Sequence, residues 1–268
     1  MRARLVELFR YRELLFNLVV RDLKVRYRNS VLGVAWSLLN PLFMMLVFTV
    51  VFTVMQRSDI ERYPVFVLCA LLPWNFFLSS VTGATGSIVN SAHLVKKVYF
   101  PREVLPLSTV LSNLVNFLLA LTVLFGMMAL FRVKLTLWIL YLPLLIVVQI
   151  VFSSGMALLL STVHVFYRDT KHIVEVVMLA WFFVTPIFWD HNILPETASF
   201  LSVDWPVRRL TFILNPMASL ISAYRDILYF GRKIDLAFLS RTVVTALAFL
   251  AIGYWIFTRY SKVFGEEV

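Results

Sequence analysis

Residues 135–163 read LTLWILYLPLLIVVQIVFSSGMALLLSTV, a run of 29 residues without a charged side chain. A helix needs about 20 mostly apolar residues to cross the hydrocarbon core of a bilayer. This run is therefore long enough to cross a membrane with some tilt. It predicts a transmembrane helix, and the chain on both sides of it contains more stretches of the same kind.

Five further stretches are predicted to span the membrane. Three of them carry no charge, the fourth is weaker because it contains Glu175, and the last contains Arg241 near its start. In chain order the five are Val31–Met55, Tyr63–Ala92, Val104–Phe131, His172–Trp189 and Leu236–Thr258. We therefore predict an all-α polytopic membrane protein with six transmembrane helices in a single domain, residues 31–268, with seven or eight spans as the alternative.

The region between the last two predicted spans has a different character. Thr211–Tyr224 is free of charge but too short to cross comfortably, and several prolines interrupt the region around it. Irregular backbone at membrane depth is tolerated only where it is buried in protein or lines a cavity. We predict a re-entrant hairpin of two short helices over residues 190–230, able to narrow an exit; an ordinary outer cap is the alternative.

The composition excludes several classes of protein. Of the 268 residues 60% are hydrophobic and only 15% are charged, whereas soluble domains are about 45–50% apolar and about 25% charged. A soluble enzyme and a disordered chain are therefore excluded. A single cysteine, Cys69, excludes a disulfide scaffold.

The charge distribution predicts the orientation. Lys and Arg concentrate on the cytoplasmic side of membrane proteins, and eight of them lie in the segment that ends at Arg28. With six spans both termini are then cytoplasmic. The net charge of +10 indicates contact with the inner leaflet rather than with nucleic acid, because no basic and aromatic nucleic-acid module is present.

The opening segment, residues 1–30, alternates apolar and basic residues at helical spacing. We predict an amphipathic helix in the headgroup plane that also touches a cytoplasmic partner. A plain basic anchor for the first span is the alternative. The basic residues expected at this interface are Arg21, Lys24, Arg26 and Arg28.

The segment between the second and third predicted spans is too apolar for a simple solvated loop. A short amphipathic helix over residues 92–102, stopped by Pro101, fits better. It is either an interfacial fold-back or an element that docks into a cytoplasmic subunit and transmits force. Its candidate contact residues are Leu94, Val95, Lys96, Lys97, Val98, Tyr99, Phe100, Pro101 and Arg102.

Aromatic residues are concentrated in the first and fifth predicted spans. Lipid-facing packing and interfacial belts explain many of them. Sugars also stack on aromatic rings, so an aromatic-lined pore would suit a carbohydrate that slides without tight binding. The candidate lining residues are Trp36, Phe43, Phe48, Phe52, Trp181, Phe182 and Phe188.

Polar residues near the ends of the fifth span are further candidates, since ionisable groups inside membranes are often functional. Glu175 either pairs with a basic neighbour near the headgroups or lines the cytoplasmic mouth. The complete set of gate and loop candidates is Tyr167, Arg168, Asp169, Glu175, Asn215 and Pro216.

The chain lacks the motifs of catalysis. Four scattered histidines have no metal-ligand spacing with the cysteine, and we find no phosphate-binding loop, nucleophile motif or paired carboxylates. We therefore expect no enzyme activity, no metal and no cofactor on this chain. If the protein is a pump, its energy comes from another subunit.

One stretch is similar to a known family. Residues 26–41, RYRNSVLGVAWSLLNP, resemble the opening motif of the membrane subunit of bacterial ABC exporters for polysaccharides: O-antigen, capsule and teichoic acid. The similarity continues in weaker motifs, which are Leu94–Pro106, Tyr167-Arg168-Asp169 followed by Thr185-Pro186, Asn215-Pro216 and Tyr224-Arg225.

This resemblance implies an assembly and a cargo. It implies a homodimer in the bacterial inner membrane above two P-loop ATPase subunits that bind ATP and Mg, and export of a glycan linked to undecaprenyl diphosphate. It also implies that Leu94–Arg102 couples to the ATPase, that the opening helix is the interface helix, and that the hairpin after Trp189 forms the exit gate. Arg26, Arg28 and Lys97 are candidates to meet the lipid diphosphate. A small or lipidic cargo such as a drug remains the alternative.

Overall fold

The computed structural model describes residues 11–28, 33, 35–55, 60–190, 198–200, 203–205, 211–212 and 215–268, and these are almost entirely helical. The helices and strands are α2 (Arg12–Tyr27), α3 (Ala35–Thr49), the π-helical turn η1 (Val50–Met55), α4 (Tyr63–Thr85), α5 (Ser87–Asn90), α6 (Ala92–Lys97), α7 (Val104–Leu130), the 3₁₀ turn η2 (Leu137–Tyr141), α8 (Leu142–Phe166), α9 (Thr170–Val184), β1 (Ala198–Phe200), β2 (Val203–Trp205), α11 (Pro216–Leu228), α12 (Leu236–Tyr260) and α13 (Phe264–Glu267).

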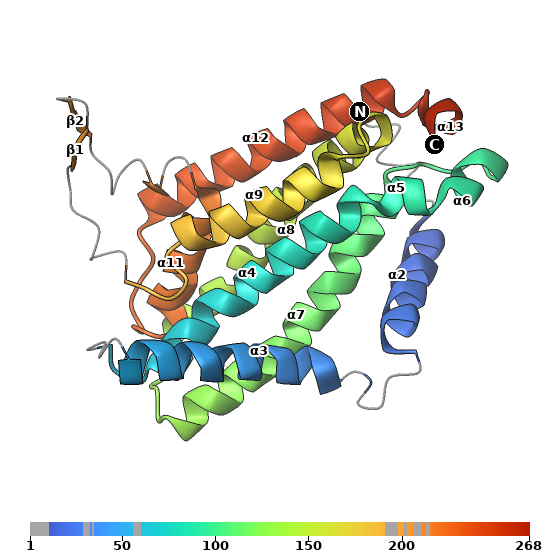
Figure 1. Ribbon diagram of the computed structural model, residues 1–268. Helices are drawn as coiled ribbons and strands as arrows, with labels where there is room; N and C mark the ends of the chain where they lie inside the picture. The colour runs from blue at the N-terminus through green and yellow to red at the C-terminus, as the bar shows by residue number, and fades with distance from the viewer. Residues whose placement is uncertain are drawn as a thin grey trace.

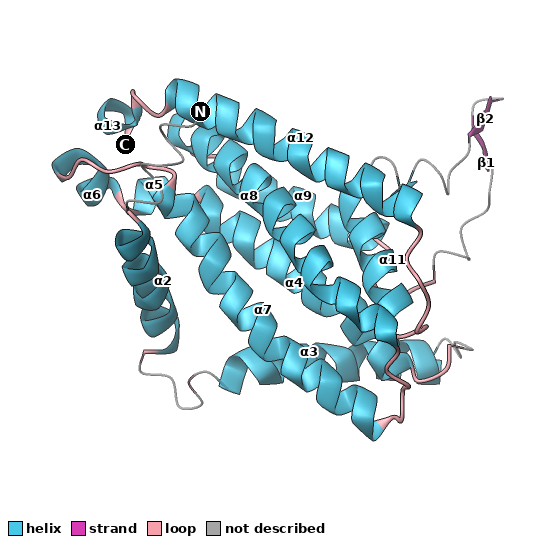
Figure 2. Ribbon diagram, turned by 180° about the vertical axis from the view of Figure 1, so that it is seen from behind, coloured by secondary structure: helices cyan, strands magenta, loops and turns pink. Residues whose placement is uncertain are grey.

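The long helices form one bundle around α4 (Figure 1). Helices α7, α8, α9 and α12 run along the bundle, whereas α3 crosses it and α2 lies beside α7 (Figure 2). One end of the bundle carries α5, α6 and α13, and we call it the α6 end. The other carries α11, and we call it the α11 end.

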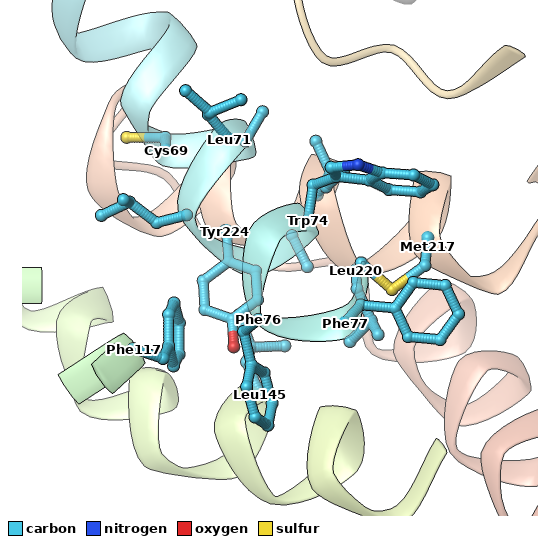
Figure 3. Close-up of a cluster of buried hydrophobic side chains, with 14 of the residues drawn as sticks. Cys69, Leu71, Trp74, Phe76, Phe77, Phe117, Leu145, Met217, Leu220 and Tyr224 are labelled. Carbon is cyan, nitrogen blue, oxygen red and sulfur yellow. The ribbon is translucent and has the colours of Figure 1, made fainter. Parts of the chain in front are cut away.

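The core is built on α4. Every residue of Val65–Trp74 is buried, which is unusual for a helix of a membrane protein and places α4 at the centre. Its aromatic residues stack on its neighbours. The ring centroids of Phe76 and Phe117 on α7 are 5.2 Å apart (Figure 3), and those of Phe77 and Phe152 on α8 are 5.1 Å apart. Such offset pairs add to the burial of the rings themselves.

A buried polar chain joins three elements within this apolar core. Gln149 Nε2 on α8 donates to the carbonyl oxygen of Pro73 on α4 at 2.6 Å. Gln149 Oε1 accepts from the hydroxyl of Tyr224 on α11 at 2.8 Å. Polar groups in an apolar interior need such partners, so this chain fixes the register of α4, α8 and α11.

Helices α8 and α12 approach each other very closely. A Cβ at Gly253 would collide with the carbonyl oxygen of Gly155, and a Cβ at Gly155 would lie 2.6 Å from Leu250 N. Small residues allow helix backbones in membranes to pack at this distance. The pair therefore holds α12 against the bundle.

Five of the six predicted spans are confirmed as helices long and apolar enough to cross a membrane. The prediction at His172–Trp189 is not confirmed, because α9 has 15 residues and ends at Val184. Thr185 is extended, as expected of a residue that precedes proline. Pro186 therefore ends the helix before it reaches the predicted length.

The predicted interface helix is not confirmed either. Helix α2 forms, but Phe16 and Val25 are each 67% exposed, so its apolar residues do not share one face. The helix instead packs against α7. The first ten residues of the predicted segment lie outside the described residues.

The prediction of a re-entrant helical hairpin at 190–230 is also not confirmed. Its second arm is helical, as α11, and is buried along nearly its whole length. Within its first arm, residues 198–200 and 203–205 form β1 and β2, an antiparallel pair in which Ser199 lies opposite Asp204, and residues 211–212 are helical. Residues 191–197, 201–202, 206–210 and 213–214 lie outside the described residues.

Candidate functional site

The 94–102 segment lies at the α6 end and is helical only in part. Helix α6 ends at Lys97, because Val98 adopts an extended conformation, so the prediction of a helix that continues to Pro101 is wrong. Pro101 instead begins the turn that leads into α7, since its carbonyl oxygen accepts from Val104 N at 3.1 Å. The helix therefore ends before the proline, ahead of Val98, whose backbone is extended.

The buried and exposed side chains of this segment divide clearly. Val95 and Phe100 are buried and Leu94 packs beside them, which anchors the segment to the bundle. Lys96, Lys97 and Val98 are exposed, and Tyr99 is 86% exposed. The segment thus presents an apolar tip with two lysines, which is suited to contact another protein.

Arg102 is the last residue of the 94–102 segment. Its guanidinium is partly buried, and this burial lowers the pKa of Arg102 from its ordinary value, an effect opposed by Glu103 and Tyr99. Arg102 Nη1 donates to the carbonyl oxygen of Ser261, which compensates the loss of water. The segment is thereby tied to the C-terminal residues.

The four basic candidates of α2 have different surroundings. Arg26 Nη1 donates to Asn113 Oδ1 on α7 at 2.8 Å, and the neighbouring Tyr27 hydroxyl donates to Asn116 Oδ1 at 2.6 Å. Arg21 pairs with the adjacent Asp22 at 3.0 Å. The remaining two residues are exposed, and they are Lys24 and Arg28.

Four of the seven aromatic candidates come together at the α11 end. Phe188 stacks on Phe48 and Phe52 with centroid distances of 6.0 Å and 5.1 Å. Phe182 joins them, 6.1 Å from Phe48. Trp36 and Phe43 are apart from this cluster and exposed by 49% and 56%. The clustered rings therefore connect the end of α3 and the turn η1 that follows it to the end of α9 and the segment after it.

Trp181 anchors the end of α9 through its ring nitrogen. Nε1 donates to Asn215 Oδ1 at 2.8 Å, and Asn215 Nδ2 donates to Thr185 Oγ1 at 2.9 Å. Asn215 Oδ1 also accepts from Ala218 N and so caps α11, where Pro216 takes the first position. Asn215 thus joins the end of α9 to the start of α11.

Arg225 is a residue that the sequence candidates omit. It is fully buried, and its guanidinium donates to the carbonyl oxygens of Pro186, Ile187 and Trp189 at 2.6, 2.5 and 3.2 Å. The same group lies 3.6 Å above the ring of Phe66. One side chain of α11 therefore holds the irregular segment after α9 in place. The sequence signals for it are its position directly after the charge-free run and its place in the quoted motif Tyr224-Arg225.

The remaining gate candidates lie at the α6 end, opposite Asn215 and Pro216. Tyr167 is exposed, and Arg168 donates to the carbonyl oxygen of Glu267 at 3.2 Å. Asp169 precedes α9 without a capping hydrogen bond from its side chain. Glu175 Oε2 lies 3.8 Å from Nδ1 of exposed His172, one helical turn earlier. The two halves of this set are thus separated by α9.

Metal ligands do not cluster in the described part of the chain: no group of three or more His, Cys, Asp or Glu residues there could hold an ion.

Comparison with known proteins shows which family the chain belongs to. The sequence model of the ABC-2 type transporter family matches residues 13–229. The chain belongs to this family. It is also 35% identical to the O-antigen export system permease protein RfbA of Myxococcus xanthus over 262 residues, 98% of each chain. Two RfbA proteins of Klebsiella pneumoniae are 32% and 31% identical over 257 residues, 94% of this chain and 95% of each relative.

The residues that match the family model contain most of the site described above. Residues 13–229 include α2, the 94–102 segment, the aromatic cluster and Arg225. Helices α12 and α13 follow the matched region, although the RfbA proteins align with nearly the whole chain. The confirmed spans agree with the membrane location that the family implies.

Proposed function

We propose that this ABC-2 type transporter is the membrane subunit of an exporter for O-antigen-like polysaccharide linked to undecaprenyl diphosphate in the bacterial inner membrane. The observation that carries the proposal is the similarity, over nearly the full chain, to proteins named as O-antigen export permeases. The first and longest of the quoted motifs, residues 26–41, supports the same assignment.

The proposed assembly contains a second copy of the chain and two P-loop ATPase subunits, which bind ATP and Mg. Leu94–Arg102, which we now call the coupling segment, contacts the ATPase through Lys96, Lys97, Val98 and Tyr99. What supports this role is the exposure of these side chains next to the buried anchors Val95 and Phe100. The chain itself then carries no catalytic residue.

The second copy would cover the exposed apolar surface of α3 and α9. Large side chains on both helices are exposed in the single chain, among them Phe43 and Leu46 on α3 and Val176 and Leu179 on α9. In this arrangement α9 is the fifth of six spans and α2 is the interface helix. The path for the glycan runs between α3 and α9 of the two copies, past their aromatic rings, to a gate beside α11.

Three cationic groups would receive the lipid diphosphate at the cytoplasmic side. Lys97 and Arg28 are exposed, whereas Arg26 is already held by Asn113 at 2.8 Å and would act from a fixed position. Charge-assisted hydrogen bonds to phosphate are stronger than neutral ones. Differential binding of ATP to the closed ATPase pair is the energy source that shifts the pore between its states.

Deletion of the gene in its host tests the proposal. We expect the lipid-linked glycan to accumulate on the cytoplasmic side and the surface polysaccharide to disappear, and a plasmid copy to restore it. Purification of the tagged chain should bring down a P-loop ATPase. A deletion strain with normal surface glycan would contradict the proposed cargo, and the alternatives of a capsule, teichoic-acid, lipid or drug cargo would then be examined.

Replacement of residues 96–102 by a Gly/Ser linker tests the coupling role. The chain should still insert and assemble, because the confirmed spans are unchanged, but export should stop. Export at the normal rate would show that the coupling segment has no such role.

A further inference from the structure

The C-terminal residues fold back onto the bundle. After α12 ends at Tyr260 the chain turns, and α13 places Phe264 in a fully buried position at the α6 end. The ring of Phe264 packs edge-on against Phe257 of α12 at 5.3 Å and against Phe166 of α8 at 6.3 Å. One side chain of the last eight residues thus bridges two long helices.

Arg102 binds the same turn from the opposite side. Its guanidinium lies 6.0 Å above the ring of Phe264, and Nη1 donates to the carbonyl oxygen of Ser261. The segment next to α6 therefore rests on the C-terminal turn through a hydrogen bond and a cation–π contact.

A third connection reaches the corner between α8 and α9. Arg168 Nη2 donates to the carbonyl oxygen of Glu267 at 3.2 Å. The turn over residues 261–268, which we call the C-terminal brace, is hence attached to α12, to the α6–α7 link and to the α8–α9 corner.

The brace belongs to one buried cluster that collects residues from most helices at this end. Its members come from α2, α5, α6, the link that follows, α7, α8, α12 and α13. They are Leu18, Ile88, Val95, Phe100, Val104, Leu105, Leu158, Val165, Phe257 and Phe264. Both buried anchors of the coupling segment, Val95 and Phe100, share this cluster with Phe264.

We propose that Phe264 is a positioning residue for the coupling segment: through the C-terminal brace it holds residues 95–102 against α8 and α12, so that displacement of α6 moves the long helices. This inference rests on the proposed function for its transport consequence. Its structural part, the immobilisation of the coupling segment by Phe264, stands on the contacts alone. Packed cores transmit displacement only while their members remain in contact.

Hydrogen exchange on the full chain in lipid nanodiscs tests the structural part. Phe264→Ala should raise the exchange rate of amides in residues 92–100 about tenfold, while peptides from Val65–Trp74 keep their wild-type rate. Phe264→Leu keeps most of the apolar volume, folds more readily and should give a smaller rise in the same peptide. Lys262→Gln, an exposed neighbour in the brace, is the matched control and should change nothing.

The number of glycans exported per ATP hydrolysed, measured in the assembled complex, tests the effect of Phe264 on transport. We expect this ratio to fall about fivefold or more in Phe264→Ala, with ATP hydrolysis maintained and Lys262→Gln at the wild-type ratio. Unchanged exchange in residues 92–100, or an unchanged ratio despite faster exchange, would overturn the inference. If wild-type complexes export no glycan, the proposed function fails, whereas the exchange result still decides the role of Phe264.

Discussion

Arg225 shows how a single buried cation can organise irregular backbone in a membrane protein. Three of its hydrogen bonds run to carbonyl oxygens of the segment after α9, a fourth runs from Nε to the carbonyl oxygen of Phe66 at 3.4 Å, and the ring of Phe66 covers one face of the guanidinium. Non-helical backbone is tolerated at membrane depth when protein groups satisfy it. A planar group with several fixed donors can do so, whereas an ammonium group acts as a point charge.

Arg225→Lys should therefore destabilise the protein although the charge is kept. Lysine cannot reach all three carbonyl oxygens, and each buried group left without a partner costs about 1–3 kcal/mol, so we expect a loss of about 2–4 kcal/mol. Denaturation in detergent, followed by fluorescence, measures the change. Arg232→Lys is the control: Arg232 is exposed, pairs with Asp226 at 2.7 Å and lies 4.5 Å over the ring of Phe230, so this variant should lose less than about 1 kcal/mol. Equal losses in both variants would contradict the role given to Arg225.

Trp181 and Trp36 allow a test of the same substitution in two surroundings. Trp181→Phe keeps a ring but removes the Nε1 donor to Asn215, so we expect a loss of about 1–2 kcal/mol of stability. Trp36→Phe changes an exposed residue and should stay within about 0.5 kcal/mol. The measurement is again denaturation in detergent. A neutral Trp181→Phe would mean that the bond to Asn215 does not hold α9 to α11.

At the scale of elements, the contact between α8 and α12 depends on the absence of two Cβ atoms. Gly253→Ala places a methyl group against the carbonyl oxygen of Gly155, and such overpacking costs about 1–3 kcal/mol. Gly126→Ala is the control, since a Cβ there meets nothing within 4 Å, and in a helix alanine is favoured by about 0.5–1 kcal/mol. We expect opposite signs for the two variants in thermal unfolding, and the same sign would argue against close packing of α8 and α12.

The sequence predicts the long elements because the cost of placing charge in a bilayer dominates them. The charge-free runs correspond to α3, α4, α7 and α8, and the run with a single arginine corresponds to α12. Helix α9 ends at Val184 because the residue before a proline disfavours the helical conformation. The prediction of a span to Trp189 follows the length of the apolar run and does not apply this local rule.

The partners within the site are less predictable, because many of them are backbone atoms. Arg225 follows the charge-free run Thr211–Tyr224, but three of its acceptors lie 36–39 residues earlier in the chain, and the fourth, the carbonyl oxygen of Phe66, lies 159 residues earlier. Carbonyl oxygens belong to every residue and leave no signature in the sequence. The aromatic rings could be named as candidates, but only the fold shows that Phe48, Phe52, Phe182 and Phe188 pack together.

At the scale of the whole molecule, the orientation depends on whether α9 carries the chain across the bilayer. Fifteen residues give a helix of about 22 Å, shorter than the hydrocarbon core of about 30 Å. The chain continues past Thr185 to Phe188 and Trp189, where Arg225 binds the carbonyl oxygen of Trp189 at the α11 end. A short helix followed by a satisfied irregular segment can thus complete the crossing.

Cysteine labelling in intact cells decides this point. In a Cys69→Ala background, Tyr99→Cys and Tyr167→Cys probe exposed positions at the α6 end, and Lys233→Cys probes an exposed position near the α11 end. Six spans with cytoplasmic termini predict that a membrane-impermeant maleimide labels only Lys233→Cys, and that all three react after the cells are opened. Labelling of Tyr99→Cys from outside would reverse the orientation that the basic residues predict. If Lys233→Cys reacts only after opening, together with the other two, α9 does not cross and the chain has five spans.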